Sequence, residues 1–175
     1  MQDAGKIFTA LTAAALSACS TSASSAALQG QDISFIGGCW EQHDAGNADF
    51  LRLLRDQDNP GGFVGDQSKV RNGEPFFTNS WVFAPGGTGA EWASTTGMAD
   101  MLMTFTPAPD LSAEGRIFPP GASAAFFWAR PGQLYLKIVR EGDMLVMSVH
   151  PAKGSHERYA ATQNVYFAGR LSGCD

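Results

Sequence analysis

The sequence contains few charged residues and no cluster of basic ones. Charged residues make up 17% of the 175 residues, and 12 Lys and Arg stand against 17 Asp and Glu, for a net charge of −5. The basic residues are spread singly along the chain, so nothing is present to neutralise a run of phosphates, and no nucleic-acid partner is expected. The low charge also argues against a coiled coil or a charged disordered tail, and the length suits one domain.

Long apolar runs are missing as well. A helix needs about 20 apolar residues to span a bilayer, whereas the longest run in the body of the chain, 122–129, is short and contains Ser123. We therefore expect the chain not to cross a membrane. Near the amino terminus, 7–18 is a stretch of twelve residues without a charge, which is the length of the apolar core of a secretory signal peptide.

Leu16-Ser17-Ala18-Cys19 closes that stretch and resembles the lipobox of bacterial lipoproteins. The resemblance implies cleavage before Cys19 and acylation of that cysteine. Ser20, where an aspartate would imply retention in the inner membrane, implies an outer-membrane anchor with the domain facing the periplasm. Several acyl chains on one residue give a stable anchor, because a single chain binds a membrane only marginally. The alternative is an ordinary secretory signal cleaved nearby, which also exports the chain.

The chain is thus expected to have three parts. Residues 1–18 form the signal peptide, 19–32 a flexible tether of small and polar residues, and 33–175 a single folded domain. Lipidation of Cys19 leaves two cysteines, Cys39 and Cys174, near the two ends of this domain. Because the periplasm is oxidising, a Cys39–Cys174 disulfide is favoured over two free thiols.

Turn signals recur roughly every 8–12 residues along the domain and predict an all-β fold. Alternating apolar residues predict a strand at 134–139 that returns, through a turn at 141–143, as a strand at 144–149. The segment 49–55 is ambiguous, because its apolar pattern also suits a short helix. These patterns predict one antiparallel up-and-down meander and leave a sandwich and a barrel open.

Gly38-Cys39-Trp40 resembles the Gly-x-Trp of the first strand of lipocalin-like (calycin) barrels. The resemblance implies that Trp40 plugs the closed end of the barrel and that a basic residue of the last strand packs across its ring. Arg170 is the residue expected to make this cation–π contact. The resemblance therefore implies an antiparallel up-and-down meander closed into a lipocalin-like barrel. A Cys39–Cys174 bridge would place the first and last strands side by side, as this closure requires.

With Glu41 included, the same block resembles the start of an uncharacterised family of small bacterial domains that begins Gly-Cys-Trp-Glu. That family carries a later Asn-Pro-Ala-His-Asp block, in which this chain has His150, Lys153 and Gly154 instead of the Asn, the His and the Asp. A function that depends on the His-Asp pair is therefore not expected here.

No residue pattern indicates catalysis directly, so a hydrolase is a less favoured alternative, and we assign no catalytic residue, metal or cofactor. Neighbouring side chains of a strand face opposite sides, so His43 and Asp44 cannot form a dyad with each other. His150 and His156 flank a loop, but the alternative of a metal or haem site there lacks a third ligand. The glycine-rich segment 86–89 has no lysine after it and is not a phosphate loop.

Aromatic residues are abundant, with twelve Phe, four Trp and three Tyr. Most must lie in the core, because a domain of this size has few other means to bury apolar area. A barrel interior lined by them would hold a small apolar or lipid-like ligand, and its expected contacts are Trp81, Phe83, Trp92, Phe105, Phe127 and Tyr135. The alternative is a packed interior in a protein that presents its loops to a partner in the cell envelope.

Overall fold

The computed structural model describes residues 30–44, 46–94, 101–108, 110–113, 121–160 and 164–174, without the side chains of 76, 77, 112, 113 and 160. The expected signal peptide, Cys19 and most of the tether lie outside these residues. In chain order the elements are η1 (Ser34–Ile36), β1 (Gly38–Asp44), β2 (Asn47–Arg55), β3 (Phe63–Arg71), β4 (Glu74–Phe83), η2 (Pro85–Gly87), β5 (Ala90–Ser94), β6 (Met101–Pro107), α1 (Asp110–Ala113), β7 (Ser123–Arg130), β8 (Leu134–Glu141), β9 (Met144–Pro151), α2 (Glu157–Ala160) and β10 (Asn164–Ser172).

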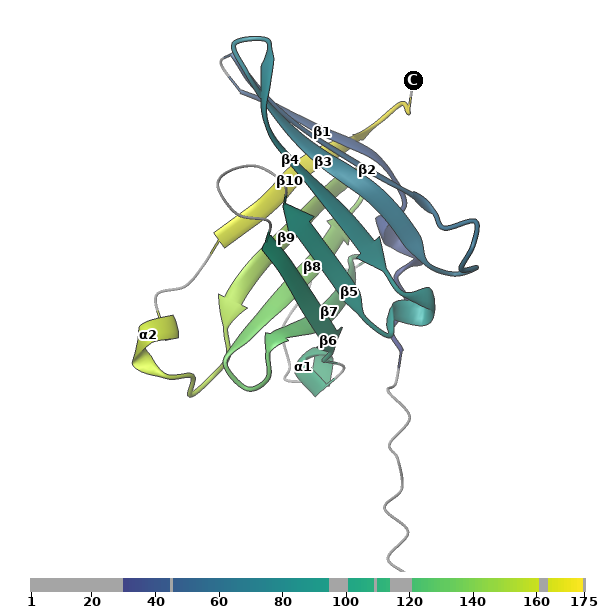
Figure 1. Cartoon of the computed structure of the whole chain (residues 1–175). Coiled ribbons are helices and arrows are strands. Elements are labelled where there is room, and N and C mark those ends of the chain that lie inside the picture. The colour runs from purple at the N-terminus through teal and green to yellow at the C-terminus, as the bar shows by residue number, and fades with distance from the viewer. Residues whose placement is uncertain are drawn as a thin grey trace, which may run out of the picture.

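The strands pair in chain order and close on themselves as one antiparallel barrel (Figure 1). The last strand pairs with the first, so that Trp40 lies opposite Leu171 and Glu41 opposite Arg170. The prediction of an all-β meander closed into a barrel is confirmed. Closure is thinnest between β6 and β7, where two residue pairs, Thr106 with Trp128 and Pro107 with Phe127, join the strands.

The segment that is ambiguous in the sequence is strand β2. Leu51 and Leu53 are buried, whereas Phe50, Arg52 and Leu54 between and beside them are exposed. This alternation is that of a strand with one face on a core. Pairing with β1 on one side and β3 on the other extends along the strand and supplies backbone hydrogen bonds that a short helix would have had to make locally.

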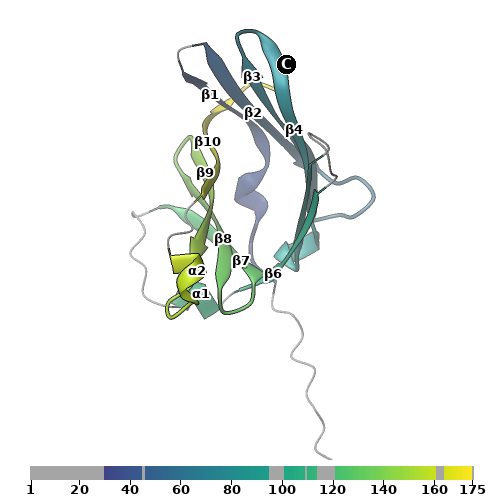
Figure 2. The ribbon, with the colours of Figure 1, turned by 60° about the vertical axis from the view of Figure 1, so that its left-hand side comes forward.

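Successive connections of an antiparallel barrel lie at alternate ends, which we call the mouth and the base. The mouth carries the β1–β2 and β3–β4 turns and α2, and the base carries η1, the 56–62 loop and η2. Figure 1 shows the mouth on the left and the base on the right. In Figure 2 the mouth is turned forward, and η1 is visible between the layer containing β2–β4 and the layer containing β8–β10.

The amino-terminal segment closes the base from inside. Ile33 and Ile36 are buried in the core, and the backbone carbonyl of Ile36 accepts a hydrogen bond from the Trp40 indole at 3.0 Å. The Gln31 amide side chain accepts a hydrogen bond from the Phe126 backbone N–H at 2.8 Å and donates one to the Phe126 carbonyl. The chain therefore reaches the barrel at its base.

The predicted disulfide is confirmed. Cys39 and Cys174 are bonded, with their Cα atoms 5.2 Å apart, and the bridge spans 135 residues of sequence. The adjoining Gly38 has a φ of +139°, which side chains rarely adopt, and a Cβ placed there would lie 2.8 Å from Leu171 Cδ1. The positive φ favours glycine at this position, and any other residue would also have to push the Leu171 side chain aside.

The partner expected for Trp40 is corrected by the structure. Arg170 lies opposite Glu41 on the outer face of the barrel, and its guanidinium bonds the Asp143 carboxylate at 2.7 Å. Trp40 is one residue away from Glu41 and therefore faces inward. Its cation is Arg140 of β8, whose guanidinium carbon lies 5.1 Å from the indole centroid.

Candidate functional site

Most of the residues expected to bind an apolar ligand pack against one another inside the barrel. Trp81 stacks on Phe83 and Phe105 with ring centroids 5.7 and 6.1 Å apart, and it lies 6.5 Å from Trp92. Phe83 in turn contacts Phe127 at 6.1 Å. All five side chains are buried and belong to one core cluster. They fill the middle of the lumen with each other.

Tyr135, the sixth expected contact, lies outside the lumen. It packs against Phe126 and Trp128 in a second buried cluster, together with Leu111 of α1. Phe127 faces inward, so its chain neighbours Phe126 and Trp128 face outward, and Tyr135 pairs with Trp128 across the sheet. The expectation that Tyr135 lines the lumen is therefore wrong, because its chain neighbour Leu136 is the residue that faces inward.

Polar side chains replace apolar ones at the inward positions nearest the mouth. In register, Gln42 of β1 lies opposite Asp49 of β2, and Asp49 lies opposite Lys69 of β3. One inward row deeper, the aligned residues are Trp40, Leu51 and Gln67. The interior thus changes from aromatic at its centre to charged at its mouth.

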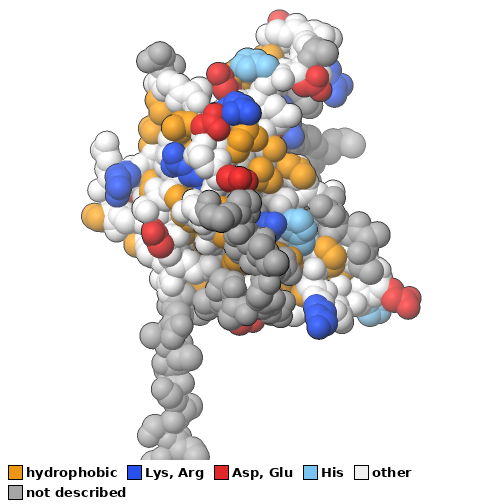
Figure 3. Space-filling model, turned by 180° about the vertical axis from the view of Figure 1, so that it is seen from behind, with side chains coloured by type: hydrophobic (Ala, Val, Ile, Leu, Met, Phe, Trp, Pro, Cys, Tyr) orange, Lys and Arg blue, Asp and Glu red, His pale blue; other side chains and the backbone are white. Residues whose placement is uncertain are grey.

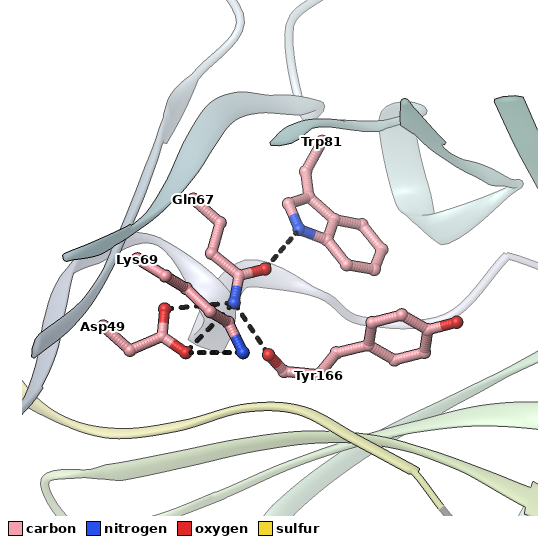
Figure 4. Close-up of polar contacts among 5 residues, drawn as sticks. All are labelled: Asp49, Gln67, Lys69, Trp81 and Tyr166. Carbon is pink, nitrogen blue, oxygen red and sulfur yellow. Dashed lines mark hydrogen bonds and ion pairs between the residues drawn. The ribbon is translucent and has the colours of Figure 1, made fainter. Parts of the chain in front are cut away.

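Gln67 joins these two parts of the interior (Figure 4). Its side chain is fully buried. The amide nitrogen donates to the Asp49 carboxylate at 3.1 Å and to the Tyr166 backbone carbonyl at 2.7 Å, and the amide oxygen accepts from the Trp81 indole at 3.5 Å. A buried amide with these partners orients the carboxylate above it, because each of its own polar atoms is already bonded.

Asp49 and Lys69 form a half-buried ion pair above this floor. Lys69 Nζ lies 3.3 Å from Asp49 Oδ2, and the side chains are 33% and 16% exposed, respectively. Burial raises the pKa of Asp49 above its ordinary value of 3.8, and the Gln67 hydrogen bond and the Lys69 charge offset this only in part. A partly desolvated carboxylate interacts more strongly with a charged or hydrogen-bonding ligand than a fully solvated carboxylate does.

A hollow of about 200 Å³ adjoins this pair at the mouth. Two carboxylates and two cations line it together with amide side chains, and its residues are Gln42, Asp44, Asn47, Ala48, Asp49, Lys69, Val70 and Arg71. Neither the hollow nor its lining suits a long apolar chain. Of these residues, only Asp44 is considered as a site residue from the sequence, and only as a partner for His43.

The histidines take local roles on separate elements. His43 lies 3.3 Å from Glu41 on the outer face, while its neighbour Asp44 lines the hollow, as expected for successive residues of a strand. His150 Nε2 lies 2.7 Å from Ser148 Oγ, and His156 Nδ1 accepts the Arg158 backbone N–H at 3.2 Å. Across the described ranges, no three His, Cys, Asp or Glu side chains come together in a group that could hold a metal ion.

Comparison of the chain with family models, curated proteins and solved structures finds no match.

In the part of the chain that the structure covers, no helix is both long and apolar enough to span a bilayer. Seen from behind, basic and acidic side chains are scattered and interleaved on the visible surface (Figure 3). The half-buried Asp49–Lys69 pair and the hollow beside it make the mouth the candidate site.

Proposed function

We propose that the protein is an exported, lipid-anchored β-barrel of the bacterial cell envelope that binds a small zwitterionic ligand at its mouth. The observation that carries the binding function is the half-buried Asp49–Lys69 pair beside a hollow lined by charges of both signs. The Leu16–Cys19 motif supports the anchor. The amino-terminal segment, which reaches the barrel at its base, supports an orientation in which the mouth faces away from the membrane.

The aromatic packing argues against the other ligand class, a small apolar or lipid-like guest in the lumen. Such a guest would have to displace Trp81, Phe83 or Phe105 from contacts in which they are buried. Pockets for small ligands are usually largely formed before binding. The mouth meets this condition, whereas the middle of the lumen is occupied by its own side chains.

Charge balance supports a zwitterion rather than a simple anion or cation. The lining has Asp44 and Asp49 for an ammonium group and Lys69 and Arg71 for a carboxylate. An arginine binds carboxylates through charge-assisted, often bidentate hydrogen bonds. A hollow of about 200 Å³ suits a molecule the size of an amino acid or a dipeptide.

Calorimetric titration of the mature chain with a panel of amino acids and dipeptides tests the binding function. At least one member is expected to bind, and Asp49→Asn and Lys69→Met are expected to weaken that binding at least tenfold. Arg52→Met and Asp66→Asn are matched controls, because Arg52 and Asp66 form an ion pair of 2.8 Å on the same two strands but on the outer face. Binding by no member, or equal loss in the controls, contradicts the proposal.

The anchor is tested by Cys19→Ala in the full-length protein. The variant is expected to lose metabolic acyl labelling and to move from the membrane fraction to the soluble periplasm. An unchanged membrane fraction would contradict the lipid anchor without affecting the binding proposal.

A second candidate function is favoured by the packed lumen itself. A barrel that holds no ligand would serve as an interaction protein of the cell envelope and present its loops to a partner. Crosslinking in intact cells distinguishes the two, because the interaction protein should yield a discrete crosslinked partner that Asp49→Asn does not abolish.

A further inference from the structure

Three aliphatic side chains form an exposed row across the outer face of β2, β3 and β4. Leu54 lies directly opposite Val64, and Val64 lies directly opposite Val82. Their exposed fractions are 46%, 36% and 41%, respectively. Directly opposite residues of antiparallel strands have neighbouring Cβ atoms, so the three side chains are contiguous.

The row lies at the base of the barrel, where the amino-terminal segment arrives. Leu54 is the penultimate residue of β2, Val64 is the second residue of β3, and Val82 is the penultimate residue of β4. The turn that follows β4 contacts the incoming chain, since a side chain on Gly30 would collide with the carbonyl oxygen of Gly86. The row and the arriving chain therefore occupy the same end of the molecule.

We infer that this row, Leu54–Val64–Val82, docks on a lipid surface. The inference rests on the proposed lipid anchor at Cys19. Residues 20–29 separate that cysteine from the described chain, and the eleven Cα–Cα steps from Cys19 to Gly30 span at most about 40 Å, or about 20 Å as a random coil. An acylated Cys19 therefore holds the base within this distance of the membrane, where contact is an intramolecular event and weak apolar insertion suffices.

The small size of the row favours lipid over a protein partner. A standard protein interface uses about 20–30 residues on each side, and the row has three. Two residues closer to the mouth, the same outer face carries the Arg52–Asp66 ion pair. Glu91 of β5 lies opposite Val82, so the row ends at β4. The row contains no Lys or Arg, so docking is expected on zwitterionic lipid without a requirement for anionic lipid.

Fluorescence of the acylated full-length mature protein in phosphatidylcholine vesicles tests this inference. Val64→Cys carries an environment-sensitive label at the row, and Val165→Cys carries it at an exposed valine near the mouth end of β10. The Val64 label is expected to shift its emission to the blue and to be quenched by spin-labelled lipid. The Val165 label is expected to keep its emission in water.

The outcomes distinguish a failure of lipid docking from a failure of the lipid anchor. Protein that floats with the vesicles while its Val64 label behaves like the Val165 label retains the anchor and overturns the docking. Protein that does not float overturns the anchor and the docking with it. A blue shift that depends on protein concentration and occurs without vesicles identifies a second copy of the chain as the occupant and also overturns lipid docking.

Discussion

The Arg140 guanidinium lies over the Trp40 indole, with 5.1 Å between its central carbon and the ring centroid. Arg140 also donates a hydrogen bond to the Phe35 carbonyl at 3.1 Å, in the segment that closes the base. One side chain of β8 therefore links the first strand and the amino-terminal closure. A cation over tryptophan contributes about 0.5–2 kcal/mol, with the higher values at desolvated sites.

Arg140→Met is expected to lower the free energy of unfolding by about 1–2 kcal/mol, because it removes the cation and leaves the Phe35 carbonyl without its donor. Urea denaturation measures this loss. Arg170→Met is the matched control, since its ion pair with Asp143 is 68% exposed on the Arg170 side and is screened by water. A larger loss of unfolding free energy for Arg170→Met than for Arg140→Met would contradict the assignment of Arg140 as the cation that stabilises Trp40.

Removal of the disulfide is expected to destabilise the barrel substantially. The Cys39–Cys174 bridge closes a long loop, and loss of a native disulfide from a small secreted domain typically costs about 2–5 kcal/mol. Thermal unfolding of Cys39→Ala/Cys174→Ala measures the effect. Peptide mapping without reductant should also recover the linked peptide, and two free thiols in periplasmic material would contradict the bridge.

Asp49 predicts a specific dependence of stability on pH. Because burial raises its pKa above 3.8, the folded state binds this proton more tightly than the unfolded state. Its contribution to stability is therefore fully present below pH 3.8 and is lost as the pH rises through the folded-state pKa. The stability of Asp49→Asn relative to the natural chain should rise over that range. A difference that stays constant with pH would contradict the raised pKa.

Truncation in the lumen tests whether the aromatic residues form a packed core. Trp81→Ala is expected to cost about 3–5 kcal/mol, through lost burial and the cavity that remains. It should also allow uptake of an apolar fluorophore that the natural chain excludes. Leu102→Ala, at a side chain that is 66% exposed, should change neither property. Uptake by the natural chain would show that the lumen is open.

Alternation and turn signals predict the all-β class and several of the strands but leave β2 ambiguous. The cysteine count, together with an oxidising compartment, predicts the disulfide. The predicted strands at 134–139 and 144–149 correspond to β8 and β9, joined by the turn after Glu141. These features depend on local residue patterns. The partner of Trp40 did not follow from them, because it depends on which face of β10 carries Arg170, and the β1–β10 register decides that.

The polar mouth was missed for a related reason. A polar residue in a strand is by default assigned to the outer face, and Gln67 and Lys69 break that rule at inward positions of β3. The available signal was their spacing from Phe63 and Gly65, which places all four on one face. To recognise it, one must know that Phe63 faces the interior, and with it every second residue of β3.

The central claim is that ligand binds at the polar mouth and that the aromatic lumen is closed. Two-dimensional ¹H–¹⁵N NMR of the mature chain tests both parts of this claim. The two probes are a zwitterionic dipeptide and a medium-chain alcohol. With the dipeptide alone, we expect saturable shifts of the Asp49 and Lys69 amides and of the Trp81 indole, which donates a hydrogen bond to Gln67. Saturable shifts around Trp92 and Phe105 with the alcohol, and an unchanged mouth with the dipeptide, would contradict it.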